Sequence, residues 1–120
     1  MPKSILIVDD SERVRASIRH FLEGHPELKV CGEAVDGLDA LEKALQLSPD
    51  LIILDLQMPG MDGLQAAREL RTMEISVPMI LFTMYAEAVP LQDAVAAGVN
   101  AVVSKTNPAA LRQHIENLLN

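Results

Sequence analysis

Short aliphatic runs alternate with longer amphipathic stretches along the whole chain. Five runs predict β-strands, and four of them are almost entirely aliphatic, as expected for strands covered on both faces of a parallel sheet. The five are residues 4–8, 28–34, 51–54, 78–82 and 101–104. In residues 28–34, Lys29 and Glu33 alternate with apolar or small positions, which favours a half-exposed edge strand.

The stretches between and after these runs have apolar residues at helical spacing and polar residues that suit helix N-caps. They predict helices over residues 12–23, 37–46, 63–73, 90–97 and 108–119, the last with Asn107 as its N-cap, and residues 84–89 as an irregular loop. In the first of them, Val14, Ile18, Phe21 and Leu22 share one face, and we expect the arginines to lie elsewhere.

Five alternating strands and helices predict an α/β fold, a parallel sheet with helices on both faces. Two strand orders are common in such doubly wound folds, the Rossmann order and the flavodoxin-like order 2-1-3-4-5. The half-exposed second strand favours the flavodoxin-like (βα)5 arrangement, because there the second strand lies at an edge.

Composition agrees with one globular domain over residues 1–120, since 49% of the residues are hydrophobic and 22% are charged. Aromatic residues make up only 2%, so the core must be aliphatic. A formal net charge of −7 disfavours binding of nucleic acid or an anionic membrane by this domain. A single cysteine permits no intramolecular disulfide, and the first residues do not resemble a signal peptide, so we expect a cytoplasmic protein.

Polar residues with distinct chemistry follow four of the five predicted strands. The first strand ends in Asp9 and Asp10, the third in Asp55, the fourth in Thr83 and the fifth in Lys105. Only the edge strand supplies no obvious chemical group. Because ligands bind at the carboxyl ends of parallel strands, we expect these side chains to share one site.

Three carboxylates at one sheet edge repel each other unless a proton or a cation is bound. Carboxylate oxygens suit Mg²⁺, and the Lys105 ammonium and Thr83 hydroxyl would then donate to an anionic group beside the metal. An aspartate such as Asp55 can act as a nucleophile toward phosphorus. The Pro59-Gly60 turn beyond it can direct the Gln57 carbonyl at a metal.

These residues stand in recognisable motifs, namely ILIVDD at 5–10, PDLIILDLQMPGMDGL at 49–64, ILFT at 80–83 and AGVNAVVSK at 97–105. With them the chain resembles, over essentially its whole length, the receiver domain of two-component response regulators. The motifs are most similar to those of regulators with a LuxR-type DNA-binding output domain, which the 120 residues do not include.

The resemblance implies that Asp55 is the phosphoacceptor and takes a phosphoryl group from the phosphohistidine of a histidine kinase. It implies Mg²⁺ as the cofactor, bound by Asp10, Asp55 and the backbone carbonyl of Gln57, with Asp9 holding the metal through water. The chain would catalyse its own phosphorylation and slow dephosphorylation, and would otherwise not be an enzyme.

The resemblance also implies roles in switching. Lys105 would pair with one phosphoryl oxygen, and Thr83 would bond another and pull its loop inward. Members often have an aromatic switch residue three positions before the lysine, where this chain has Val102. Tyr85, two residues after Thr83, is a candidate to take over part of that role.

The expected function is therefore a phosphorylation-dependent signalling switch. The face formed by the fourth helix, fifth strand and fifth helix would change and control an output domain or a partner protein, including transcription regulation. A homodimer formed on phosphorylation is a further expected partner.

Three other functions are compatible with parts of the sequence. A metal-dependent phosphatase with an aspartate nucleophile would want a second acid where Gln57 stands. A flavin-binding electron carrier would want aromatic residues for the ring, which the chain almost lacks. A pseudo-receiver would be an interaction module that is never phosphorylated, although all the expected site residues are present.

Overall fold

A computed structural model describes all 120 residues and contains one parallel five-stranded sheet in the order β2-β1-β3-β4-β5. The strands are β1 (Lys3–Val8), β2 (Leu28–Ala34), β3 (Leu51–Leu54), β4 (Met79–Thr83) and β5 (Ala101–Ser104). Both the fold class and the strand order predicted from the sequence are confirmed.

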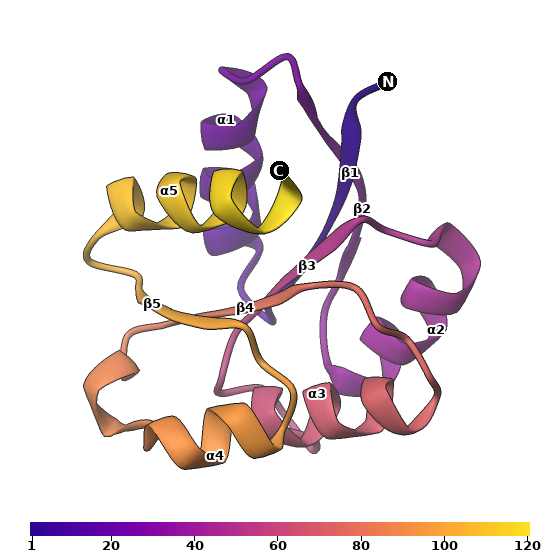
Figure 1. Cartoon of the computed structure of the whole chain (residues 1–120), viewed down its shortest axis with the longest axis vertical. Helices are drawn as coiled ribbons and strands as arrows, with labels where there is room; N and C mark the ends of the chain where they lie inside the picture. Colours follow the sequence, from indigo (N-terminus) through magenta and orange to yellow (C-terminus); the bar gives the residue numbers. More distant parts are fainter.

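Helices cover both faces of this sheet (Figure 1). They are α1 (Glu12–Glu23), α2 (Gly37–Leu47), α3 (Gly63–Thr72), α4 (Leu91–Ala96) and α5 (Pro108–Leu119). Figure 1 shows α1 and α5 on one side of the sheet and α2, α3 and α4 on the other. None of the helices has the length and apolar character needed to cross a lipid bilayer.

The central strands are buried on both faces, and alternate residues along each strand serve different cores. Leu6 of β1, Ile52 of β3 and Leu81 of β4 belong to the core under α2, α3 and α4. Ile5 of β1 and Ile53 of β3 belong to the core under α1 and α5. Strands that are covered on both sides need apolar residues at every position, which explains why the runs in the sequence are continuous.

Several boundaries differ from the sequence-based prediction. β4 begins at Met79 and includes Thr83, because Pro78 has no N–H to donate and Thr83 pairs with Ser104 of β5. α4 begins at Leu91 and not at residue 90, since the Pro90 backbone is extended, with φ −61° and ψ 137°, and serves as the N-cap.

Four further elements differ by a residue or a turn. β1 begins at Lys3 and not at residue 4. α2 continues to Leu47 and α3 ends at Thr72. The segment predicted to be an irregular loop contains a short 3₁₀ helix, η1 (Ala86–Ala88).

Candidate functional site

The polar residues at the strand ends are held by backbone hydrogen bonds that continue the sheet one residue further. The N–H of Asp9 donates to β2 at 3.1 Å, that of Asp55 to β1 at 2.9 Å, and that of Lys105 to β4 at 2.9 Å. Their backbones are therefore as firmly placed as the strands themselves. This is why three segments distant in sequence deliver side chains to one point.

The three aspartates form a single cluster. One carboxylate oxygen from each of Asp9, Asp10 and Asp55 lies within 4.8 Å of the others. Asp9 and Asp55 are buried, with 1% and 7% of their surface exposed, whereas Asp10 is exposed. The sequence-based expectation that these residues converge is confirmed by this geometry.

Lys105 bridges two of the three acids. Its Nζ lies 2.9 Å from Oδ2 of Asp9 and 3.2 Å from Oδ1 of Asp55. Burial by itself would lower the pKa of the Lys105 ammonium, but the hydrogen bond and charge of Asp9, together with Asp55, outweigh it and raise that pKa. Lys105 is therefore charged at neutral pH.

Asp55 is in an unfavourable place for a carboxylate. Burial is the main cause that raises the pKa of Asp55, and the negative charge of Asp9 raises it further. The charge and hydrogen bond of Lys105 act in the opposite direction but do not cancel the shift. A group or ion that brings positive charge to this point would stabilise the ionised form.

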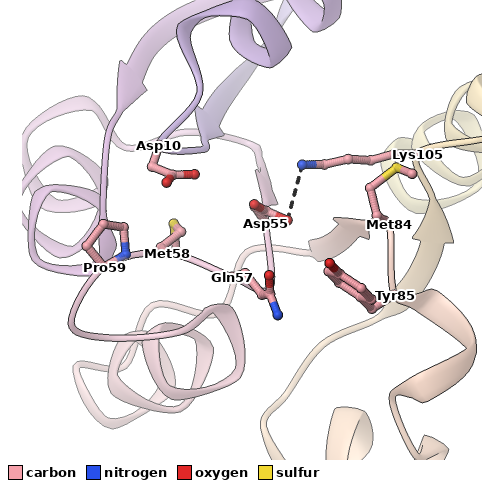
Figure 2. Close-up of a pocket in the computed structure, with 8 residues that line it drawn as sticks. All are labelled: Asp10, Asp55, Gln57, Met58, Pro59, Met84, Tyr85 and Lys105. Atoms are coloured by element: carbon pink, nitrogen blue, oxygen red, sulfur yellow. Dashed lines mark ion pairs between the residues drawn. The ribbon is translucent and has the colours of Figure 1, made fainter.

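A cavity of about 430 Å³ opens in front of Asp55. Figure 2 shows Asp10, Asp55 and Lys105 pointing toward one another inside it, with an ion pair between Asp55 and Lys105. Eight residues line it, namely Asp10, Asp55, Gln57, Met58, Pro59, Met84, Tyr85 and Lys105. The Asp55 carboxylate is therefore open to small molecules that enter this cavity from solvent.

The donor set fits a divalent cation. Asp9, Asp10 and Asp55 contribute three carboxylates, and the Lys105 ammonium pairs with only two of them, Asp9 and Asp55. The Asp10 carboxylate makes no ion pair or hydrogen bond with the protein and faces the cavity (Figure 2). Oxygen ligands of this kind, open to water on one side, are those that Mg²⁺ takes in proteins.

The residues expected to take part in switching occupy three different environments. Thr83 is fully buried, and its hydroxyl accepts a hydrogen bond of 3.1 Å from the backbone N–H of Tyr85. Tyr85 is half exposed at the rim of the cavity. Val102 is partly buried and packs against the core under α4, so it does not line the cavity.

The loop after β3 folds back tightly on the phosphoacceptor candidate. The N–H of Gly63 donates to the carbonyl of Leu56 at 2.7 Å, and a Cβ on Gly63 would lie 2.2 Å from the Asp55 carbonyl oxygen. Only glycine permits this approach. The closed loop brings Gln57, Met58 and Pro59 to one wall of the cavity.

Sequence reasoning missed one residue near the site. The expectation that the arginines of the first helix lie away from its apolar face is wrong for Arg15, which is buried together with Ile18 and Leu22. Its NH1 donates to the backbone carbonyl of Asp9 at 2.7 Å. The signal was present in the spacing, since positions 15, 18 and 22 lie on one side of a helix.

Comparison with known proteins agrees with this geometry. The family model described as "Response regulator receiver domain" matches residues 5–116. The response regulator VraR of Staphylococcus saprophyticus is 37% identical over 110 residues, which are 92% of this chain and 53% of that protein. A protein-glutamate methylesterase/protein-glutamine glutaminase of Nocardioides is 41% identical over 103 residues, which are 84% of this chain and 28% of that protein. The chain therefore spans about half or less of the length of these curated relatives.

Solved structures show the same arrangement. A LuxR-family response regulator from Aurantimonas superposes with a TM-score of 0.91 at 32% identity, covering 99% of this chain and 86% of that one. The response regulator TrrA from Thermotoga maritima, solved with Mg²⁺ and BeF, superposes with a TM-score of 0.85 at 31% identity. The match covers 98% of this chain and 99% of TrrA.

Receiver domains act as phosphoacceptors and bind Mg²⁺ at the acidic phosphorylation site, and the acidic cluster of this chain is consistent with both. The resemblance seen in the sequence motifs is therefore confirmed. By its matching family model, its relatives and its fold, this chain belongs to the receiver domains of two-component response regulators.

Proposed function

We propose that this chain is a phosphorylation-dependent signalling switch in which Asp55 accepts a phosphoryl group from the phosphohistidine of a histidine kinase. The observation that carries the proposal is the Lys105 ammonium, 3.2 Å from Asp55 in a cavity that the unpaired Asp10 also faces. In the transfer, a carboxylate oxygen of Asp55 forms a bond to phosphorus. The phosphorus–nitrogen bond breaks, and its electron pair stays on the imidazole.

The neighbouring residues supply positioning and charge, which phosphoryl transfer needs most. Lys105 has three N–H donors, so it can keep Asp9 and still donate to a phosphoryl oxygen. Mg²⁺ held by Asp10, Asp55 and the Gln57 backbone carbonyl, with Asp9 acting through water, would neutralise charge on the phosphoryl oxygens.

The hydrogen bond between Thr83 and Tyr85 suggests how phosphorylation of Asp55 would change the surface beyond the site. The Thr83 hydroxyl accepts the N–H of Tyr85, so its own proton is free to be donated to a phosphoryl oxygen. If Thr83 moves toward the phosphoryl group, Tyr85 must follow or lose its acceptor. This link gives Tyr85 part of the role for which Val102, packed in the core, is unsuited.

The face formed by α4, β5 and α5 is the proposed output surface. α4 has only six residues, and its Leu91 and Val95 are 78% and 66% exposed. A partner must bind the two states of this surface with different affinity, and moving a 1:99 equilibrium to 99:1 takes about 5.5 kcal/mol of differential stabilisation. We infer that the charge-assisted contacts of the phosphoryl group with Lys105, Thr83 and Mg²⁺ supply that stabilisation. An output domain, a partner protein or a second copy of the chain would then bind one state more tightly, for control of transcription in regulators of the LuxR type.

The test is an intact-mass measurement after incubation with Mg²⁺ and a small phosphodonor. The wild-type chain is expected to gain one phosphoryl group, and the Asp55→Asn variant and a chelator-treated sample are expected to gain none. Asp62→Asn is the matched control, because it makes the same substitution at an N-cap that asparagine also serves. A folded wild-type chain that gains no phosphoryl group from a small donor leaves two explanations, a block of small donors by Met84 and the Val102 substitution, or a pseudo-receiver that acts by binding alone. No gain from a phosphorylated histidine kinase either would refute the proposal.

A further inference from the structure

Arg15 is a buried arginine in the first turn of α1, and 8% of its surface is exposed. Its NH1 donates to the Asp9 carbonyl at 2.7 Å, its Nε donates to Glu33 at 2.9 Å, and its NH2 pairs with Glu12. A planar guanidinium with several fixed donors can hold three partners in one geometry, which a lysine cannot. Arg15 therefore connects α1, the end of β1 and the end of β2.

The bond to the Asp9 carbonyl completes the anchoring of that residue. The N–H of Asp9 donates to β2 at 3.1 Å, and its carboxylate accepts from Ser11 at 2.9 Å and from Lys105 at 2.9 Å. The Asp9 carbonyl is the remaining polar group, and Arg15 holds it. The peptide that leads from Asp9 to Asp10 is thus fixed at its oxygen.

Asp10 depends on this anchoring because its own carboxylate has no protein partner. Its position in front of Asp55 is set by the backbone that precedes it and by the start of α1, where Ser11 is the N-cap. If the peptide between Asp9 and Asp10 were free to rotate, the Asp10 carboxylate would no longer be held within 4.8 Å of the other two.

The edge strand has a part in this arrangement. Glu33 lies near the end of β2 opposite Ile7 of β1, and it pairs with both Arg15 and Arg19 of α1. No residue of β2 lines the cavity, in agreement with the expectation from the sequence, so the part of Glu33 is indirect. Glu33 acts one step away from the site, because it orients the guanidinium that holds Asp9.

We propose that Arg15 is a positioning residue for the cation site, which fixes the turn between β1 and α1 so that Asp10 and Asp55 present their oxygens together. The inference rests on the Mg²⁺ site of the proposed function. Replacing a residue that hydrogen-bonds to a metal ligand commonly lowers metal affinity by about 10-fold to 100-fold. Arg15 reaches the site through the backbone of Asp9, and Glu33 supports Arg15 in turn.

Loss of the Arg15 charge and loss of its positioning contacts would change the affinity for Mg²⁺ in opposite directions. Removing a positive charge near a cation site, with nothing else moved, would strengthen Mg²⁺ binding. Loss of positioning would weaken it. The two explanations predict changes of opposite sign for Arg15→Met.

The experiment is a calorimetric titration of the full chain with Mg²⁺, for the wild type, Arg15→Met, Arg15→Lys and Arg19→Met. Arg19→Met is the matched control, since Arg19 lies on the same helix and pairs with Glu33 but does not contact Asp9. Arg15→Met is expected to weaken Mg²⁺ binding about 10-fold. Arg15→Lys should be intermediate and Arg19→Met close to the wild type.

A second measurement separates positioning from loss of fold. Phosphorylation of Arg15→Met by a small phosphodonor should be slow at limiting Mg²⁺ and should approach the wild-type level at saturating Mg²⁺. Affinity for Mg²⁺ in Arg15→Met equal to or tighter than that of the wild type would overturn the inference. If that variant does not fold, wild-type affinity in Arg15→Lys would overturn it.

The same data keep the two proposals apart. If the wild-type chain itself binds no Mg²⁺ and gains no phosphoryl group, the proposed function fails. If the wild type does both and Arg15→Met matches it at every Mg²⁺ concentration, only the role of Arg15 fails.

Discussion

Replacing Asp55 by asparagine should make the chain more stable at neutral pH when Mg²⁺ is removed. Asp55 is 7% exposed, and its pKa is raised by burial and by Asp9. The ionised Asp55 carboxylate is therefore less stable in the folded chain than in the unfolded chain, where water surrounds it. Asparagine keeps the size and a carbonyl oxygen for Lys105 but removes that charge.

The magnitude follows from the contacts. With an effective dielectric constant of about 20, Asp9 within 4.8 Å repels Asp55 by at least ~3 kcal/mol, and Lys105 at 3.2 Å attracts it by ~5 kcal/mol. Asp10 is exposed and adds only ~1 kcal/mol of repulsion in a water-like dielectric. These charges nearly cancel, so the cost of burying the carboxylate decides the sign, and we expect a gain of about 2 kcal/mol.

The pH dependence has a defined direction. A carboxylate whose pKa is raised by folding gives the wild type extra stability below its ordinary pKa of 3.8, and this is lost as the pH rises through the folded value. Asparagine does not titrate. The advantage of Asp55→Asn should therefore be largest at neutral pH and should shrink as the solution is acidified.

The assay is urea unfolding followed by circular dichroism, with a chelator present, in steps from neutral pH to about pH 4. Thermal unfolding should shift by roughly 4 °C for each kcal/mol in a domain of this size. Glu69→Gln is the control for net charge, because Glu69 is exposed and makes no ion pair. Equal or lower stability of Asp55→Asn relative to Glu69→Gln at neutral pH would refute the reasoning, as would a difference that does not fall with pH.

Two further substitutions test the frame beside the site and the opposite edge of the sheet. Gly63→Ala should cost about 3 kcal/mol and slow phosphorylation, because its Cβ would lie 2.2 Å from the Asp55 carbonyl oxygen. Gly24→Ala, whose Cβ would meet nothing closer than 3.6 Å, should be nearly neutral in the same unfolding assay. Arg71→Met should lower the free energy of unfolding by about 2–3 kcal/mol. Arg71 donates to the carbonyl of Gly98 at 2.7 Å and to the carbonyls of Ile75 and Val77, in the loop that follows α3. The affinity for Mg²⁺, measured by calorimetry, should not change in Arg71→Met, because these carbonyls lie at the amino ends of the strands. A change in that affinity would contradict a Mg²⁺ site at the carboxyl ends.

Much of the site could be predicted without coordinates because of two regular features. Aliphatic runs mark buried parallel strands, and the residue after each run must lie at the carboxyl edge of the sheet. That reasoning places Asp10, Asp55 and Lys105 together, and the structure confirms it. The roles of Gln57 as a metal ligand and of Thr83 as a phosphoryl contact stay predictions.

Tertiary packing decided what no linear pattern states. Arg15 reads as a surface arginine of an amphipathic helix, yet burial is possible because Glu33, which is distant in sequence, and the Asp9 carbonyl accept its hydrogen bonds. Gly63 reads as a helix start, and only the approach of the Asp55 carbonyl shows why a side chain is excluded there.

The chain sequence alone therefore determined the sheet, its order and the chemical groups at its edge, because these depend on local period and on the identity of single residues. The partners of those groups depend on which segments meet in space. The strength of each contact depends further on how much water the fold removes around it. For this receiver domain, the aspartates and Lys105 could be found from the sequence. The contact of Arg15 with the turn between β1 and α1 became visible only in the tertiary structure.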